Sequence, residues 1–222
     1  MKHFKNFKTC VYCTAQTLAS LDETTLARDY AYLEKYVGID KVYLETYRDG
    51  TWVAIDHMKM IQNFFKEHGV EIAGGITAVT PPLEKDDAKR QRLFQTFCYS
   101  NETMRTYLKK IVTYTAELFD EIILDDFFFT SCTCDDCLRE RSNLSWAEFR
   151  SNKMIDVAEN LVLKPAKLAN PSVKVTIKYP NWRESYHETG YVPKIQRLCL
   201  TKSILEQKLE TLHTRISICH DI

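Results

Sequence analysis

Five strand-like segments alternate with helical segments along the first 178 residues of the chain. The strand-like segments are short apolar runs, and in the helical segments apolar side chains recur every three or four residues. The strand-like segments are 11–15, 41–46, 70–76, 121–125 and 173–178, and the helical segments are 22–36, 55–68, 101–118 and 145–168. Alternation with short connections is typical of parallel βαβ units, so the sequence predicts an α/β protein.

Periodicity alone does not distinguish a doubly wound sheet from a (β/α)8 barrel, but two further observations favour the barrel. The first strand-like segment runs into residues 13–17, which lack the glycine-rich turn of a dinucleotide-binding sheet. Polar side chains recur where the strands end, at Gln16, Glu45, Asp126 and Lys178. A barrel gathers such residues on one face, so we expect a (β/α)8 TIM-barrel-type fold.

The barrel predicted from this chain is incomplete. A full barrel has eight strands and about 250 residues, whereas residues 9–197 account for about five βα units. Residues 198–222 contain no clear strand and are predicted to form an atypical C-terminal tail. A one-nucleotide shift in plausible codons for residues 200–211 would encode a peptide that resembles a further barrel strand. The tail is therefore either genuine or the product of a frameshifted or truncated gene.

Composition restricts the class of partner. The chain has 222 residues, and its 30 Lys and Arg residues balance 30 Asp and Glu residues, which argues against nucleic-acid binding. No apolar run approaches the ~18–20 residues that span a bilayer, and the N-terminus lacks the apolar segment of a signal peptide. We expect no membrane partner and a cytoplasmic location. A partial barrel would expose strand edges and apolar helix faces, which favours oligomers.

Four cysteines suggest a metal site. Cys132, Cys134 and Cys137 form a C-x-C-x-x-C run, and thiolates spaced in this way suit tetrahedral zinc. Cys98, in a strand-like segment before the helix at 101–118, is the candidate for the fourth ligand. We expect structural zinc; unligated loop cysteines and a redox pair are the alternatives.

Two adjacent carboxylates, Asp125 and Asp126, end the fourth strand-like segment. Side chains alternate along a strand, so one of them should face the barrel interior and the other the helices. Asp126 is nearer the open face, where an aromatic neighbour such as Phe127 could raise its pKa, so it is the better candidate for a general acid. The alternative is that both residues cap or bridge adjacent loops.

Residues Glu45, Tyr47 and Arg48 close the second strand-like segment. A carboxylate and a guanidinium can hydrogen-bond to sugar hydroxyls, and a tyrosine ring can pack against a sugar ring. We therefore predict that these three residues contribute to a carbohydrate site. A turn stabilised by Arg48 and Asp49 is the alternative for the end of this segment.

The fifth strand-like segment ends in a similar set, with Lys178, Tyr179 and Trp182 close together. The cation and the two aromatic rings are predicted to bind the same carbohydrate. Apolar closure of the barrel rim is the alternative for the two rings.

The chain resembles the (β/α)8 glycoside hydrolases of the large retaining clan, especially the family 42 β-galactosidases. In those enzymes a C-x-C-x-x-C run follows the fourth strand and binds zinc together with an upstream cysteine, and a helix containing Phe-Arg follows, as Phe149 and Arg150 do here. The amino-acid sequence is also similar to those of uncharacterised glycosidase-like barrels of gut bacteria. The resemblance covers roughly residues 10–193.

The resemblance implies O-glycoside hydrolysis by two carboxylates. It places the acid/base at the end of the fourth strand, where the family has Asn-Glu and this chain has Asp125 and Asp126. The family's nucleophile comes from a late strand that these 222 residues do not include. A noncatalytic carbohydrate-binding or degenerate barrel is the alternative function. A zinc-dependent hydrolase would need an open metal position, which a four-thiolate site lacks.

Overall fold

The computed structural model of this chain describes residues 6–80, 92–179, 186–199, 202–209 and 216–221, with side chains for 6–80, 92–179 and 188–196. In chain order the elements are β1 (Cys10–Cys13), α1 (Ala15–Ser20), α2 (Glu23–Tyr36), β2 (Lys41–Arg48), β3 (Thr51–Trp52), α3 (Ile55–Glu67), β4 (Glu71–Ile76), η2 (Leu93–Gln95), α4 (Glu102–Leu118), β5 (Glu121–Leu124), α5 (Asp135–Arg141), α6 (Trp146–Asp156), the π-helical η3 (Val157–Leu163), α7 (Lys164–Ala169), β6 (Lys174–Tyr179), α8 (Tyr186–Thr189), α9 (Pro193–Cys199), β7 (Lys202–Leu209) and β8 (Ile216–Asp221).

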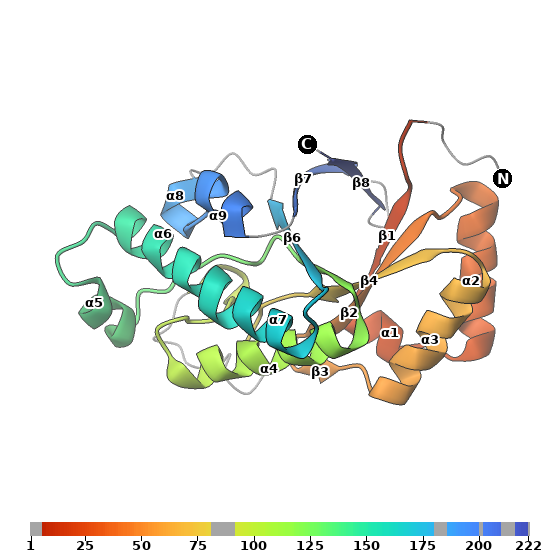
Figure 1. The fold of residues 1–222 in the computed structure, drawn as a ribbon, viewed down its shortest axis with the longest axis horizontal. Coiled ribbons are helices and arrows are strands. Elements are labelled where there is room, and N and C mark those ends of the chain that lie inside the picture. The colour runs from red at the N-terminus through yellow and green to blue at the C-terminus, as the bar shows by residue number, and fades with distance from the viewer. Residues whose placement is uncertain (1–5, 81–91, 180–185, 200–201, 210–215, 222) are drawn as a thin grey trace.

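The sheet closes on itself through the described strands (Figure 1). Strands β1, β2, β4, β5, β6 and β7 pair in parallel, each with the next. Strand β8 runs antiparallel to both β7 and β1 and completes the ring, while the short β3 forms a hairpin with the end of β2. The α/β fold of TIM-barrel type with five βα units is confirmed, and the ring differs from a complete barrel because β8 closes it in the opposite direction.

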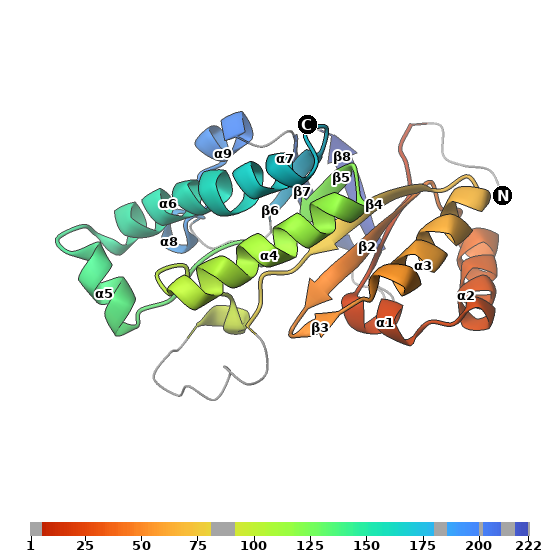
Figure 2. The same cartoon turned by 60° about the horizontal axis from the view of Figure 1, so that its bottom comes forward.

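Helices cover the outside of the ring in two groups. One group is α1, α2 and α3, which bury apolar side chains such as Leu18, Leu26 and Met58 against β1 and β2. The other group includes α4, α6 and α7, which lie along the side formed by β4, β5 and β6 (Figure 2). None of the helices in the described part of the chain is long and apolar enough to cross a bilayer.

The inside of the ring holds a smaller apolar cluster. Cys10, Tyr43, Ala73 and Ile123 come from four adjacent strands, and Tyr12 packs against them. These residues fill the interior below the carboxyl ends of the strands. The next inward-facing positions along the strands therefore lie at the edge where barrel enzymes place their chemistry.

Local sequence signals account for where the helices begin. The Ser145 hydroxyl accepts a hydrogen bond from the backbone N–H of Glu148, whose carboxylate accepts from the Ser145 N–H. This reciprocal pair is a capping box. Asp22 and Thr25 form a second one at the start of α2. The helix predicted from Ser145 to residue 168 is present as α6, η3 and α7 in succession.

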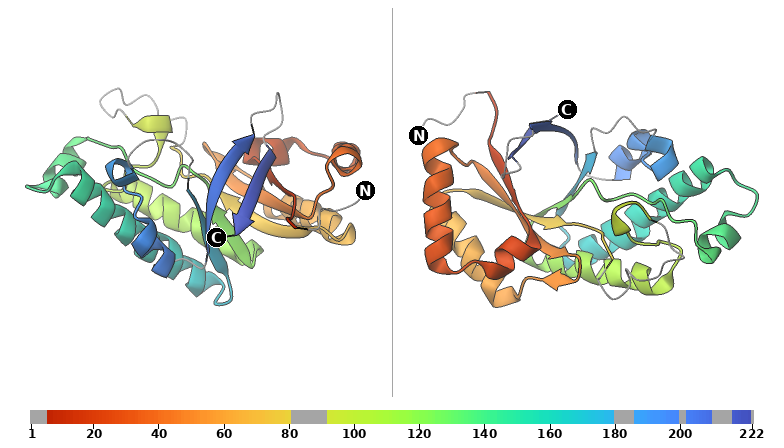
Figure 3. Two further views of the ribbon diagram at one scale, coloured as in Figure 1. Left: turned by 90° about the horizontal axis from the view of Figure 1, so that it is seen from above. Right: turned by 180° about the vertical axis from the view of Figure 1, so that it is seen from behind.

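The prediction that residues 198–222 contain no clear strand is wrong, because β7 and β8 lie in this segment (Figure 3). The sequence of β7 mixes charged, polar and apolar residues without strict alternation. Periodicity therefore gave no signal for it. The backbone pairs with β6 in parallel all the same, from Lys202 to Leu205.

Candidate active site and metal centre

Charged side chains at the ends of three strands of the ring, β2, β5 and β6, meet at the carboxyl edge of the sheet. Glu45 and Arg48 stand at the end of β2, Asp125 and Asp126 follow β5, and Lys178 precedes the last residue of β6. The sequence predicted each of these residues as part of a site. The structure brings all five together.

Glu45 is the most deeply buried member of this cluster, with none of its surface exposed. Its Oε1 accepts a hydrogen bond of 2.8 Å from the Tyr12 hydroxyl, and its Oε2 accepts one of 2.7 Å from the Ala15 backbone N–H. Arg48 Nε and the Thr77 hydroxyl also donate to it. Burial raises the pKa of Glu45, and the guanidinium of Arg48 opposes that rise. With four protein donors around its two oxygens, Glu45 orients its neighbours.

Arg48 links the two acidic parts of the cluster. Its Nε lies 2.9 Å from Glu45 Oε2, and its Nη2 donates to Asp125 Oδ2 at 3.0 Å. The guanidinium carbon is 5.6 Å from the centre of the Phe127 ring. Two carboxylates and an aromatic face therefore fix the plane of this side chain, which is the setting in which arginine is better suited than lysine.

Both aspartates approach Lys178. Asp125 Oδ1 forms an ion pair with Lys178 Nζ, and Asp126 Oδ1 lies 3.6 Å from the same nitrogen. Strict alternation along the strand predicted that the two carboxylates would diverge. They do not, because β5 ends at Leu124 and Asp126 lies in the turn that follows.

The ionisation of Asp125 is set by its partners. Complete burial alone would raise the pKa of this carboxyl. Attraction to Lys178 and Arg48 outweighs burial and lowers the pKa of Asp125 to about 2. Asp125 is therefore an anion at neutral pH.

Replacing Asp125 by Asn is expected to lower the free energy of unfolding by about 2–3 kcal/mol at pH 7. A pKa about two units below the usual ~3.9 corresponds to that amount at ~1.4 kcal/mol per unit. Because the folded-state pKa is the lower one, this stability is present above pH ~4 and is lost as the pH falls through the folded value of about 2. Urea denaturation of both proteins at a series of pH values measures the difference.

The control for this prediction is Asp29→Asn, because Asp29 is exposed and pairs with its neighbour Arg28. We expect it to change stability by less than ~0.5 kcal/mol. If the wild-type protein and Asp125→Asn differ equally at pH 7 and pH 2, ion pairing does not stabilise Asp125.

Two of the predicted sugar-binding tyrosines lie away from this cluster. Tyr47 is fully buried against Trp52 and Tyr107, because the β2–β4 register shifts between Glu45 and Tyr47 and the ring turns outward. Tyr179 packs edge-on against Tyr191 with its hydroxyl 3.2 Å from Gln196. Both side chains are buried among other aromatic rings, and their role in sugar binding stays a prediction. The predicted Trp182 lies outside the described residues.

Tyr12 and Thr77 belong to the cluster, and the sequence analysis did not identify them. Tyr12 reaches Glu45 from β1, and the Thr77 hydroxyl, just after β4, lies 3.3 Å from Asp125 Oδ2 as well as beside Glu45. A Cβ at Gly75 would lie 2.7 Å from the Tyr12 hydroxyl. The glycine pair in β4 was therefore an available signal, since glycine inside a strand often marks a close approach.

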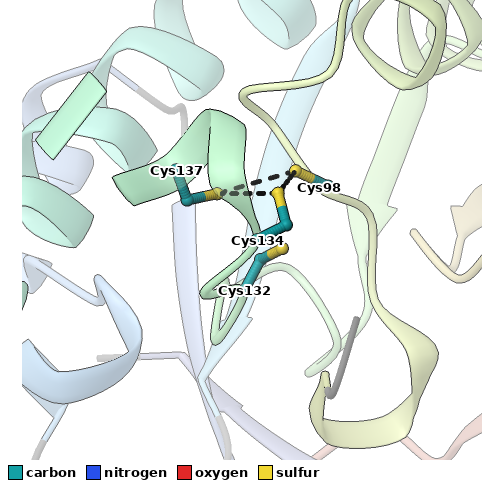
Figure 4. Close-up of side chains that lie close together, drawn as sticks. All are labelled: Cys98, Cys132, Cys134 and Cys137. Carbon is teal, nitrogen blue, oxygen red and sulfur yellow. Dashed lines mark hydrogen bonds between the residues drawn. The ribbon is translucent and has the colours of Figure 1, made fainter. Parts of the chain in front are cut away.

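The four predicted thiols form a second cluster (Figure 4). Cys98 lies in the segment before α4, Cys132 and Cys134 lie in the loop after β5, and Cys137 is in the first turn of α5. The four sulfurs lie within 4.8 Å of one another. The cluster therefore connects the loop after β4 to the loop after β5.

The spacing of these sulfurs suits a metal ion. Cys98 Sγ is 3.6 Å from the sulfurs of Cys134 and Cys137, which are 3.8 Å apart. A disulfide requires about 2.05 Å, whereas four sulfurs at ~2.3 Å around a tetrahedral ion are about 3.8 Å apart. The cluster can hold a metal through four thiolates.

The chain has recognisable relatives. Residues 1–197 match the family model described as "Probable glycosyl hydrolase, catalytic domain". An uncharacterised protein of Saccharolobus solfataricus is 33% identical over 210 residues, which cover 84% of this chain and 34% of that protein. The chain thus spans about a third of the length of this curated relative.

Two solved structures are similar at low sequence identity. A beta-arabinopyranosidase aligns with a TM-score of 0.42 and 12% identity over 92% of this chain and 26% of its own. A thermostable mutant of a xylanase from Cellvibrio japonicus aligns with a TM-score of 0.41 and 10% identity over 79% of this chain and 51% of its own. At TM-scores below 0.5, neither similarity bears on function.

The family match covers all five residues of the charged cluster and the four cysteines. It agrees with the expected resemblance to glycoside hydrolases, and it does not distinguish family 42 among them. The chain therefore belongs to the family of probable glycosyl hydrolase catalytic domains.

Proposed function

We propose that the protein containing this chain hydrolyses O-glycosidic bonds with retention of configuration, and that Asp126 is its general acid/base. The observation that carries the proposal is the cluster of Glu45, Arg48, Asp125, Asp126 and Lys178 at the carboxyl edge of a barrel-type sheet in a glycosyl hydrolase family. This edge is where barrel enzymes place catalytic residues.

The two aspartates are proposed to have different roles. Asp125 is paired with both Arg48 and Lys178, so it stays ionised and keeps these two cations in position. Asp126 lies beside it, with Oδ1 3.6 Å from Lys178 Nζ. Because Asp125 is already held by both cations, we assign the transfer of a proton to the leaving group to Asp126.

The second carboxyl of the reaction is proposed to lie outside this chain. A retaining enzyme needs two carboxyls about 5–5.5 Å apart, one of them free to attack the sugar. Glu45 is engaged by four donors and does not fit that role. The chain covers only 34% of its curated relative, and the resemblance to the retaining clan places the nucleophile on a later strand.

Arg48 and Lys178 are proposed to donate hydrogen bonds to substrate hydroxyls. Both cations are held in place by carboxylates, and the side chains keep 18% and 11% of their surface exposed. Ordered donors at a partly open site can orient a ligand with little further loss of side-chain entropy.

The metal at the four cysteines is proposed to be zinc, in a structural role. Four thiolates suit zinc and leave no open coordination position, so the ion would activate no water. It would hold the loops after β4 and β5 together, next to Asp126.

A test of the function is to incubate the full-length protein with a panel of aryl α- and β-glycosides and to follow the anomeric proton of the first sugar released. We expect turnover with at least one glycoside, and the first product should have the anomeric configuration of the substrate. Inversion would exclude the retaining mechanism. Saturable sugar binding without turnover would favour a noncatalytic carbohydrate-binding protein instead.

A further inference from the structure

Two consecutive residues in the turn η2 adopt a backbone conformation that side chains disfavour. Phe94 has φ of 53° and Gln95 has φ of 58°. In this left-handed region the Cβ crowds the backbone, so residues other than glycine, asparagine and aspartate are uncommon there. Strained backbone of this kind occurs more often at functional sites.

Hydrogen bonds from two directions hold the turn in this conformation. The Leu93 N–H donates to Ser131 Oγ at 2.8 Å, and the Gln95 carbonyl accepts from the Thr80 N–H at 2.8 Å. Ser131 lies in the loop after β5 and Thr80 in the segment after β4. The turn is therefore anchored to both loops that border the charged cluster.

The strained turn leaves the Phe94 ring largely exposed. The residue has 56% of its surface accessible, although phenylalanine is among the residues most often buried. It packs edge to face with the Phe127 ring, with the centres 5.4 Å apart and the planes at 88°. The ring centre also lies 6.4 Å from that of the fully buried Phe129. The turn therefore holds the Phe94 ring against two aromatic neighbours while more than half of the residue stays exposed.

Phe127 connects this exposed ring to the charged cluster. It directly follows Asp126, and its ring lies 5.6 Å from the guanidinium carbon of Arg48. Arg48, Phe127 and Phe94 are thus consecutive contacts from the carboxylates to the rim.

We propose that Phe94 is a binding residue for the sugar that departs when the glycosidic bond is cleaved. This inference rests on the proposed function, since a general acid at Asp126 gives its proton to the leaving-group oxygen and so stands on the leaving-group side of the bond. A sugar ring presents apolar C–H groups on its faces, and an exposed aromatic ring buries them while the hydroxyls remain solvated. The strained turn projects the Phe94 ring so that it can make this contact.

The test compares Phe94→Ala with Leu93→Ala in the full-length protein. Leu93 is the matched control, because it is the preceding residue and is 52% exposed. The substrates are β-linked disaccharides (lactose, cellobiose and xylobiose) and the corresponding glycosyl fluorides, which have no leaving-group sugar. We expect Phe94→Ala to lose about tenfold in kcat/KM on the disaccharide, equivalent to ~1.4 kcal/mol, mainly through KM. The glycosyl fluoride should be hydrolysed within about twofold of wild type, and Phe94→Trp should recover the disaccharide activity.

Direct binding keeps the two proposals distinguishable. Calorimetric titration with the same disaccharides should show about tenfold weaker binding to Phe94→Ala than to Leu93→Ala, whether or not the bond is cleaved. Equal affinities of these two variants would overturn the role of Phe94 and leave the proposed function standing. If the wild-type protein binds none of the disaccharides, Phe94 loses its assigned ligand.

The backbone strain gives a second readout that does not depend on a ligand. Phe94→Gly and Phe94→Ala both remove the ring, but only glycine adopts a positive φ without crowding. We expect the glycine variant to melt about 2 °C or more above the alanine variant, and both to bind the disaccharide equally weakly. A glycine variant that melts no higher than the alanine variant would show that the positive φ at position 94 costs the protein no stability.

Discussion

Replacing Asp126 by Asn is expected to lower kcat/KM for alkyl glycosides and disaccharides by about 10²–10⁴-fold, the usual contribution of general acid catalysis. An alkoxide is a poor leaving group and needs a proton as the bond breaks, whereas an amide side chain cannot supply one. Substrate binding should change little, because Asp and Asn have nearly the same size. Steady-state kinetics of the full-length protein measure the loss.

The dependence on leaving group separates acid catalysis from a structural effect. A dinitrophenolate departs without protonation, so the first step should be almost unaffected by Asp126→Asn for dinitrophenyl glycosides. Added azide should then accelerate turnover, because an anion can attack the glycosyl-enzyme without the base that water needs. The control is Asp29→Asn, an exposed residue on α2. An equal loss on all leaving groups, with no effect of azide, would remove Asp126 from the role of acid.

The alternation of strands and helices was predictable because it depends on local patterns. Each buried strand is a short apolar run, and each helix has an apolar face that packs on the ring. The capping box at Ser145 was visible for the same reason. Strand β7 was not, since its pairing with β6 is a long-range contact that leaves no periodic signal in its sequence.

The candidate site was predictable to the extent that side chains followed the regular geometry of a strand. Glu45 and Lys178 lie where alternation and strand ends put them. Tyr47 does not, because the register shift in β2 reverses the side on which it projects. A bulge of this kind is set by the neighbouring strand, so one strand's sequence does not reveal it.

The contacts within the site were the least predictable part. Tyr12 on β1 and Thr77 just after β4 both donate hydrogen bonds to Glu45 on β2. In the sequence, Tyr12 is 33 positions before Glu45 and Thr77 is 32 positions after it. No local motif joins these three residues. The four cysteines were easier to assign, because three of them are close in sequence and their chemistry is distinctive.

The second prediction with a large expected effect concerns zinc binding by these four cysteines. Purified full-length protein is expected to contain about one zinc at this site, and Cys98→Ser should lower the affinity for zinc by more than about 100-fold. The loss of an outer-shell partner alone costs 10–100-fold, and Cys98 is proposed as a direct ligand. Competition with a chromophoric chelator measures the affinity, and metal analysis gives the stoichiometry.

The loop after β5 should become accessible when the metal is removed. Cys137 is buried in the first turn of α5, and Arg139, two residues later, has 76% of its side chain exposed. Without an ion, thiolates within 4.8 Å of one another repel, so the thiols protonate or separate. We expect trypsin to cut after Arg139 at least tenfold faster in chelator-treated protein and in Cys98→Ser than in the zinc-bound wild type.

Cys13→Ser is the matched control for this experiment. Burial raises the pKa of the Cys13 thiol to about 11, and the residue lies on β1, so it remains neutral and takes no part in the cluster. Its variant should keep the zinc and the slow cleavage after Arg139. Because the same loop carries Asp126, chelation should also reduce glycoside turnover together with protection from trypsin, and added zinc should restore both. A folded protein without metal, in which all four thiols react freely while Arg139 stays protected, would show that packing alone holds this loop.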